Sequence, residues 1–307
     1  MYRHLSASEK AFEYKHLEQI KSIFPELDIE SKDFHTDGFA NDVITINNKT
    51  VFRFPKYQWA LDDMFHEESC IQTVRLHTSM RLPEWSVHHD KFISYQRIPG
   101  SAMHPWKIVK ENQETIAQAA ADLGQFLKDL HHIPVKELRA ADIHESITNH
   151  SYVDWLKFYD DIQQELYPAM TSTTQNWADT LFRSIISDNS LMDFQPKFIA
   201  GELSSSHILF DYEKKVVSGI VDFRSAGTGD PAFDLAYFYS QYGERFVEMM
   251  QYVYQGSARL LKRARFIAET FPLQWALGGI RTGNPYWYLL QLGTKCGFSS
   301  VYEKFSQ

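Results

Sequence analysis

The sequence predicts an α+β fold in two lobes, because strand-forming and helix-forming segments are unevenly distributed along its 307 residues. Short alternating apolar segments dominate before residue 98, whereas most of the later sequence has the apolar spacing of helices. A Pro-Gly pair at 99–100 separates the two parts. We therefore predict a small β-rich N-terminal lobe over residues 1–98 and a larger, mainly helical C-terminal lobe over residues 99–307, with a hinge at about 97–100.

The elements of the N-terminal lobe follow from local patterns. Apolar residues at helical spacing predict helices over residues 6–24 and 59–78. In residues 43–54, β-branched or aromatic residues alternate with polar ones, which predicts strands. The central Asn47-Asn48 pair predicts a tight hairpin turn between them, because asparagine tolerates positive φ.

Helices dominate the second lobe and are interrupted once by strands. A strand over residues 91–98 leads into the hinge, and helical patterns then extend over about 113–190 and 234–305. Residues 117–133 have the i, i+3, i+4, i+7 apolar spacing of an amphipathic helix. Between the two helical regions, residues 197–223 form an island of predicted strands.

Composition and charge narrow the class of protein. Hydrophobic residues make up 44% of the sequence, which is too much for a disordered chain. Two cysteines are too few for a disulfide scaffold or a zinc ribbon and favour the reducing cytoplasm. No apolar run reaches the roughly 18 residues of a membrane span, and a net charge of −8 argues against nucleic acid and is compatible with a cationic ligand. We expect a cytoplasmic protein with a small-molecule partner and neither a nucleic-acid nor a membrane partner.

The strand island brings together residues that can carry chemistry. Residues 207–211 and 216–223 are two apolar segments joined by a charged turn, so their outer ends lie side by side in a hairpin. This arrangement places Glu202 and His207 near Asp222. Two carboxylates and an imidazole at a strand end can bind a divalent cation and orient a hydroxyl group. Taken singly, each residue is more often a capping, turn or solvated residue, so the prediction depends on their joint arrangement.

The same island resembles a known family. The motifs H-G-D-L-S-S-x-H-I-L-F-D and I-I-D-F-G of the aminoglycoside phosphotransferases resemble AGELSSSHILFD (200–211) and IVDFR (220–224). The likeness is closest to the 2″-phosphotransferases, which share a protein-kinase-like fold with choline kinases. It covers about residues 20–300 and includes four further segments, VFRFPK (51–56), YQRIPG (95–100), LGQFLKDLHHIPV (123–135) and SQYGERF (240–246).

The resemblance implies a kinase that uses ATP or GTP with Mg²⁺. Glu202 would take the position of the catalytic base, and His207 and Asp222 would take those of the metal ligands. In the N-terminal lobe, Arg53 would contact the α- and β-phosphates, and Glu67 would pair with it from the neighbouring helix. The remaining implied nucleotide contacts are the backbone from Gln96 to Ile98, at the base, and the loop from Gly38 to Asp42, over the phosphates. For that loop an ordinary β-turn is the alternative.

Four positions depart from the family motif where the chemistry is expected. Ala200, Glu202, Arg53 and Arg224 stand where the motif has histidine, aspartate, lysine and glycine. Glutamate adds about 1.5 Å of reach, and a misplacement near 1 Å can cost about a hundredfold in rate. Arginine is a planar fork rather than a point charge. Arg224 is interpreted as an extra cation over the phosphates, as an obstruction of the metal site or as a surface salt bridge. These departures leave the fold prediction intact and make weakened turnover an alternative.

The substrate is expected between the late helices and the loop after Asp222. Asp230, Asp234 and Glu244 are candidate partners for the ammonium groups of a cationic substrate. Capping of a helix by Asp230 and solvation of Glu244 are the alternatives. An aromatic wall of the same site is predicted from Trp287, Tyr286 and Tyr288.

The predicted function is a nucleotide-dependent phosphotransferase acting on a hydroxyl group of a small cationic molecule, with an aminoglycoside as the first candidate and antibiotic resistance as its role. One alternative is a catalytically impaired kinase-like protein that binds nucleotide or ligand without efficient turnover. Another is a kinase of a metabolite such as choline or homoserine. A protein kinase is disfavoured, because neither a G-x-G-x-x-G nor an A-P-E segment occurs.

Overall fold

A five-stranded antiparallel sheet forms the strand-rich part of the molecule. The computed structural model describes residues 7–36, 40–88, 92–284 and 291–292. The strands are ordered β1-β2-β3-β5-β4, and each pairs with its neighbours in antiparallel fashion. Their bounds are β1 (Lys32–His35), β2 (Asn41–Ile46), β3 (Thr50–Pro55), β4 (Ser86–His88) and β5 (Phe92–Gln96).

The predicted hairpin joins β2 and β3. Asn47 and Asn48 have φ angles of 54° and 52°, the left-handed conformation that asparagine tolerates. The backbone N–H of Lys49 donates to the carbonyl of Ile46 at 3.0 Å, which closes the turn. The hairpin prediction is therefore confirmed.

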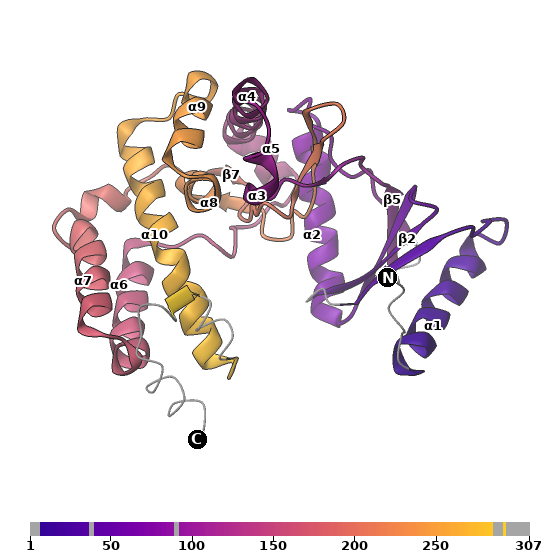
Figure 1. The fold of residues 1–307 in the computed structure, drawn as a ribbon, viewed down its shortest axis with the longest axis horizontal. Coiled ribbons are helices and arrows are strands. Elements are labelled where there is room, and N and C mark those ends of the chain that lie inside the picture. The colour runs from indigo at the N-terminus through magenta and orange to yellow at the C-terminus, as the bar shows by residue number, and fades with distance from the viewer. Residues whose placement is uncertain (1–6, 37–39, 89–91, 285–290, 293–307) are drawn as a thin grey trace.

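Two helices flank this sheet, α1 (Ala7–Ile23) and α2 (Gln58–Arg75), and the sheet lies between them (Figure 1). Ile20 of α1 packs with apolar side chains of the strands in a small buried cluster. Its other buried members are Ile44, Ile46, Phe52, Phe54 and Phe92. By contrast, Ile71 and Val74 of α2 belong to the larger cluster that fills the helical part. α1 therefore packs into the small core, and α2 connects the sheet to the large core.

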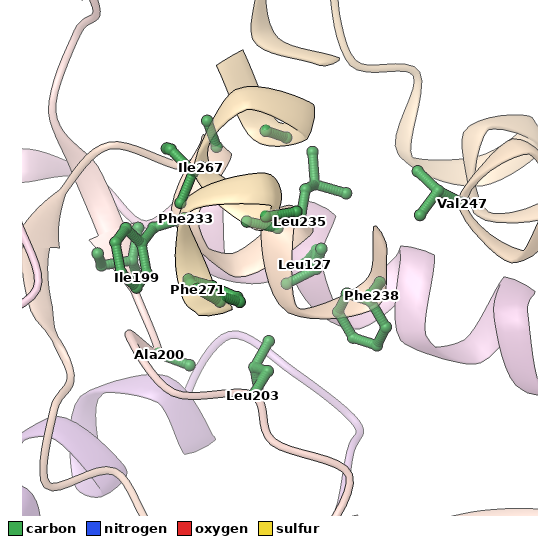
Figure 2. Packing of buried hydrophobic residues seen from close by; sticks show 14 of the residues in the cluster. Leu127, Ile199, Ala200, Leu203, Phe233, Leu235, Phe238, Val247, Ile267 and Phe271 are labelled. Carbon is green, nitrogen blue, oxygen red and sulfur yellow. The ribbon is translucent and has the colours of Figure 1, made fainter. Parts of the chain in front are cut away.

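Helices build the rest of the molecule. α4 packs against α9, and α10 packs against α8. Figure 2 shows Leu127 of α4 and Leu235 of α8 within the core that these helices share. The helical stretch predicted over 113–190 is divided near Pro134 and Pro168, since proline has no N–H for a helix. The bounds are α3 (Pro105–Ile108), α4 (Gln113–His131), α5 (Val135–Ala140), α6 (Tyr152–Asp161), α7 (Ser172–Ile186), α8 (Ala232–Tyr242), α9 (Glu244–Tyr254) and α10 (Ala258–Arg281), with a π turn at Ile162–Leu166 and 3₁₀ turns at Tyr167–Ala169 and Asn189–Met192.

Two small sheets interrupt the helices and carry the loops of interest. β8 (Ile208–Asp211) and β9 (Val216–Ile220) form the hairpin predicted in the strand island, and β6 (Ser101–Ala102) extends it along β8. β7 (Lys197–Ile199) pairs with β10 (Gly227–Gly229). These pairings place the segments before β8 and after β9 next to each other.

The predicted α+β architecture, with a small strand-rich part and a larger helical part, is confirmed (Figure 1). Among the described helices, none combines the length and the apolar character needed to cross a lipid bilayer.

Candidate functional site

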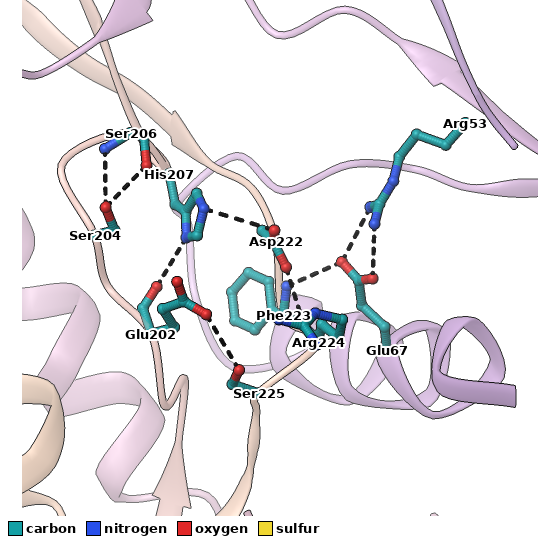
Figure 3. Close-up of polar contacts among 10 residues, drawn as sticks. All are labelled: Arg53, Glu67, Glu202, Ser204, Ser206, His207, Asp222, Phe223, Arg224 and Ser225. Carbon is teal, nitrogen blue, oxygen red and sulfur yellow. Dashed lines mark hydrogen bonds and ion pairs between the residues drawn. The ribbon is translucent and has the colours of Figure 1, made fainter. Parts of the chain in front are cut away.

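A cleft of about 380 Å³ lies where the five-stranded sheet meets the loops around β8 and β9. Five residues that the sequence singles out, Arg53, Glu202, His207, Asp222 and Arg224, line it together (Figure 3). Ala40 and Asn41, from the loop expected over the phosphates, also line it, and sequence reasoning missed Val43, Tyr95 and Val221. Val43 and Tyr95 lie in strands and Val221 directly follows one, and strand alternation gives no sign of a cleft.

Arg53 and Glu67 form a buried ion pair in the cleft wall. Two nitrogens of the Arg53 guanidinium donate to the two Glu67 oxygens, each at 3.2 Å. Glu67 also accepts the backbone N–H of Phe223 at 3.0 Å, so it connects β3 to the residue after Asp222. Burial opposes the charge on Arg53, but Glu67, Tyr95 and Asp222 together outweigh it and raise the pKa of the arginine. Arg53 therefore stays cationic.

His207 and Asp222 face each other across the cleft. The Nδ1 of His207 donates to the backbone carbonyl of Glu202 at 3.0 Å, which directs Nε2 toward Asp222. The distance from Nε2 to the Asp222 Oδ2 is 3.6 Å. Burial acts to raise the pKa of Asp222, but the charges of His207 and Arg53 and the backbone N–H of Arg224 hold it below its ordinary value. The Asp222 carboxylate is therefore ionised.

A divalent cation fits these two side chains when its other ligands come from elsewhere. Within the described residues, no group of three or more His, Cys, Asp or Glu side chains is arranged to hold a metal. Mg²⁺ in kinase sites takes one or two carboxylates and completes its coordination with water and phosphate oxygens. The Asp222 side chain is 35% exposed to the cleft and available for this role, with the Nε2 of His207 beside it.

Glu202 lies on the loop before β8, and its carboxylate is held by a serine that sequence reasoning missed. The hydroxyl of Ser225 donates to the Glu202 Oε2 at 3.3 Å. Ser225 is 3% exposed, and its carbonyl accepts the Ser146 hydroxyl at 2.6 Å, so its position is well defined. Gly201 has a φ of +75°, and a Cβ there would lie 2.2 Å from the Ser225 carbonyl oxygen. A residue larger than glycine at position 201 would therefore displace the backbone of Ser225, which holds Glu202.

Asp234 anchors the loop that carries Glu202, and its prediction as a substrate residue is wrong. Its carboxylate accepts the backbone N–H groups of Ala200 at 3.0 Å and of Gly201 at 2.9 Å. His131 donates from Nε2 at 3.1 Å, and the Tyr254 hydroxyl is 2.6 Å from the other ring nitrogen. Asp234 is 0% exposed, so a substrate ammonium group cannot reach it.

Asp230 is also buried and is not available to a substrate. Its carboxylate binds Arg263 through two hydrogen bonds of 2.6 and 2.9 Å. It also accepts the N–H of Ala232, at the first residue of α8, at 3.0 Å. The capping alternative is therefore the correct one for Asp230, and the substrate prediction is wrong.

The remaining candidates Glu244, Gln96 and Ile98 differ in their exposure to solvent. Glu244 is exposed and forms an ion pair with Arg265, whose hydrogen bond to it lowers the pKa of the glutamate. Gln96, the last residue of β5, is exposed, and Ile98, within the predicted hinge, is buried. Gly38 and Trp287 lie outside the described residues, as do Tyr286 and Tyr288.

This combination defines the class of protein. A strand arginine paired with a helix glutamate, a loop carboxylate and an aspartate after a hairpin are arranged as in kinase-like phosphotransferases. Residues 34–267 match the sequence model of the phosphotransferase enzyme family (APH), and the chain belongs to this family. The family predicted from the sequence is confirmed.

Known proteins agree with this assignment. The chain is 28% identical to viomycin phosphotransferase from Streptomyces vinaceus over 199 residues, which are 63% of this chain and 65% of that protein. The structure of the GDP complex of aminoglycoside 2′-phosphotransferase-IIIa superposes with a TM-score of 0.81 at 20% identity, over 95% of this chain and 98% of that one. Macrolide 2′-phosphotransferase from Brachybacterium faecium superposes with a TM-score of 0.70 at 17% identity, over 91% and 97%.

Proposed function

We propose that this protein transfers the γ-phosphoryl group of ATP or GTP to a hydroxyl group of a small cationic antibiotic, with an aminoglycoside as the first candidate. The observation that carries the proposal is the single cleft in which Glu202, His207 and Asp222 meet the Arg53–Glu67 pair. Related solved structures contain GDP with kanamycin and ATP with streptomycin, which supports both halves of the proposal.

The chain's residues divide the reaction between them. Glu202 orients the acceptor hydroxyl and takes its proton as the oxygen attacks phosphorus. Arg53, held by Glu67, contacts the phosphates in the same cleft. Asp222 and His207 would hold Mg²⁺, which would supply charge neutralisation for the phosphates when bound. The backbone from Gln96 to Ile98 is proposed to meet the nucleotide base.

The substrate contacts need revision, since Asp230 and Asp234 are buried. Of the predicted acidic partners, Glu244 remains exposed, and its ion pair with Arg265 would have to open for a substrate ammonium group. Trp287 is retained as a proposed aromatic contact. The net charge of −8 favours attraction of a cation to the whole molecule.

Phosphoryl transfer tests the proposal directly. Wild-type protein is incubated with ATP or GTP, Mg²⁺ and a panel of aminoglycosides, viomycin and a macrolide, and phosphorylated product is measured by mass spectrometry. We expect one or more panel members to be phosphorylated, and Asp222→Asn to reduce the rate at least about a hundredfold. Absence of product, together with no thermal shift on adding nucleotide, would refute the proposal.

A catalytically impaired, ligand-binding protein is the second candidate, favoured by Glu202, Ala200, Arg53 and Arg224 at the chemistry. Glu202→Asp discriminates between the two. An impaired enzyme would gain about tenfold or more in rate from the shorter carboxylate, whereas a site adapted to glutamate would lose rate. Adding choline and homoserine to the panel separates a metabolite kinase from both.

A further inference from the structure

Arg224 stands apart from the other charged groups that line the cleft. Arg53 is 8% exposed, and two of the five N–H donors of its guanidinium go to Glu67. Arg224 is half-buried and lines the same cleft, and no residue within the described ranges accepts a hydrogen bond from its guanidinium. The charge of Arg224 helps to lower the pKa of the neighbouring Asp222 carboxylate, but its guanidinium N–H groups are left for an anionic ligand in the cleft.

The surroundings of Arg224 are those of the proposed reaction centre. Its backbone N–H donates to the Asp222 Oδ1 at 3.3 Å, and Figure 3 shows it on the loop between Asp222 and Ser225. Ser225 in turn holds Glu202. The residue therefore lies between the proposed metal ligand and the serine that contacts the proposed base.

The segment expected over the phosphates does not supply positive charge. Residues 36–42, with the sequence TDGFAND, contain two aspartates, one glycine and no lysine or arginine. Phosphate-binding loops usually rely on several glycine N–H groups or a lysine to balance the charge of the phosphates. Of the residues that line the cleft, Arg53 and Arg224 carry a permanent positive charge, so Arg224 adds to the charge that Arg53 and a bound metal ion would offer a triphosphate.

We propose that Arg224 binds the γ-phosphoryl group during transfer and acts as an arginine finger supplied by the same chain. The inference rests on the proposed function. In the step, the bond between the γ-phosphorus and the β–γ bridging oxygen breaks, and its electron pair leaves with the nucleoside diphosphate. The acceptor oxygen forms the new bond to phosphorus, and its proton passes to Glu202. The guanidinium donates to the equatorial oxygens, where charge accumulates.

This role explains a position at which the family motif has glycine. When the loop has glycine, the positive charge next to the phosphates comes from the metal ions and the strand lysine. This chain has arginine at both the strand and the loop positions. The opposite interpretation is that Arg224 obstructs the metal side of Asp222. If Arg224 binds the phosphoryl group, removing its side chain should slow transfer. If Arg224 obstructs the metal side of Asp222, removing its side chain should speed transfer.

A transition-state mimic separates the two interpretations without an acceptor substrate. Affinities for ADP and GDP with Mg²⁺ are measured by calorimetry with and without aluminium fluoride, which imitates the transferring phosphoryl group. We expect aluminium fluoride to tighten diphosphate binding of the wild type about a hundredfold or more. Arg224→Gln should bind diphosphate within about threefold of wild type and lose most of that gain, and Arg224→Lys should recover part of it.

Turnover gives a second readout on the same variants. Arg224→Gln should lower kcat about a hundredfold or more and leave the KM for the acceptor unchanged, because the contact forms only with the transferring group. Arg139→Gln, which removes an exposed arginine of α5, is the control and should match the wild type. Circular dichroism melts establish that each variant is folded.

The outcomes are separable. An undiminished aluminium fluoride effect in Arg224→Gln, or tighter diphosphate binding and faster turnover in Arg224→Gly, overturns the inference and favours obstruction. A wild type that binds neither ADP nor GDP overturns the proposed function and the inference with it. A wild type that binds diphosphate normally while Arg224→Gln retains its full kcat overturns the inference alone.

Discussion

At the scale of single residues, the contact between Ser225 and Glu202 decides where the longer carboxylate of this chain is held. A hydrogen bond to a charged group contributes about 1.5–3 kcal/mol, and 1.4 kcal/mol is a factor of ten. We expect Ser225→Ala to lower kcat about tenfold, because the Glu202 carboxylate then samples several rotamers. Ser206→Ala, an exposed serine of the same loop, should leave the rate unchanged.

A double-mutant cycle shows whether this loss passes through Glu202. In a Glu202→Gln background, Ser225→Ala should cost little more, because the group it positions is already lost. An equal loss in both backgrounds would mean that Ser225 supports the loop in general and does not position the carboxylate.

The buried Asp234 leads to a prediction about stability. Removing one partner from a buried charged network costs about 3–5 kcal/mol, and Asp234→Ala leaves two backbone N–H groups and His131 without their acceptor. We expect the free energy of unfolding in urea to fall by that amount. Glu248→Ala, an exposed position on α9, is the control and should change stability by less than about 0.5 kcal/mol. Equal stability of the two variants would contradict the anchoring role.

The residues of the site were predictable to different degrees. Glu202, His207 and Asp222 converge because one hairpin places them, so the prediction needed only a local strand-turn-strand pattern. Asp230 and Asp234 were assigned to the wrong role because a carboxylate near a helix start serves a ligand or a backbone equally well in sequence. Ser225 could not be predicted, since its contact with Glu202 depends on how the loop after β9 folds back.

At the scale of elements, the turn between β2 and β3 contains two asparagines with different structural roles. The Asn47 side chain accepts the N–H groups of Glu30 and Ser31 and donates to the Asp28 carbonyl. Asn48 is exposed and supplies only its positive φ. We expect Asn47→Gly to destabilise the protein by about 1–2 kcal/mol, because three hydrogen bonds are lost.

The paired variant provides the control for this turn. Asn48→Gly should stay within about 0.5 kcal/mol of wild type, because glycine suits the same backbone conformation. Urea unfolding of the two variants measures the difference. If Asn48→Gly were the more destabilising, the side-chain contacts of Asn47 would not be what fixes the turn.

Strands with a clear apolar pattern of their own were predicted, and the shortest strands were not. The β2–β3 and β8–β9 hairpins follow from alternation around a turn. β6 and β10 contain only two and three residues and exist through pairing with distant segments. No local pattern can reveal such strands, because their hydrogen bonds depend on the packed helices around them.

At the scale of the whole molecule, α2 couples the small and the large core. Its Glu67 reaches Arg53 on β3, and its His66 ring lies 3.0 Å from the Ala226 carbonyl in the loop after β9. The hinge at about 97–100 remains a proposal. It is supported by Arg97, whose N–H donates to Lys49 in the first part, and by Ser101, which pairs with Phe210 in the second. A ligand in the cleft therefore touches segments from both parts.

Nucleotide binding should consequently slow hydrogen exchange in both parts at once. A ligand that binds only the folded state at 100 times its Kd stabilises it by about 2.7 kcal/mol. With ADP or GDP and Mg²⁺, we expect slower amide exchange in β2 and β3, in the loop at 200–207 and in the loop at 221–225, measured by mass spectrometry. Asp222→Asn should lose most of this protection, because it removes the proposed metal ligand. Protection confined to the five-stranded sheet would mean that nucleotide binds one part without closing the contact through Glu67, and coupling by α2 would then be wrong.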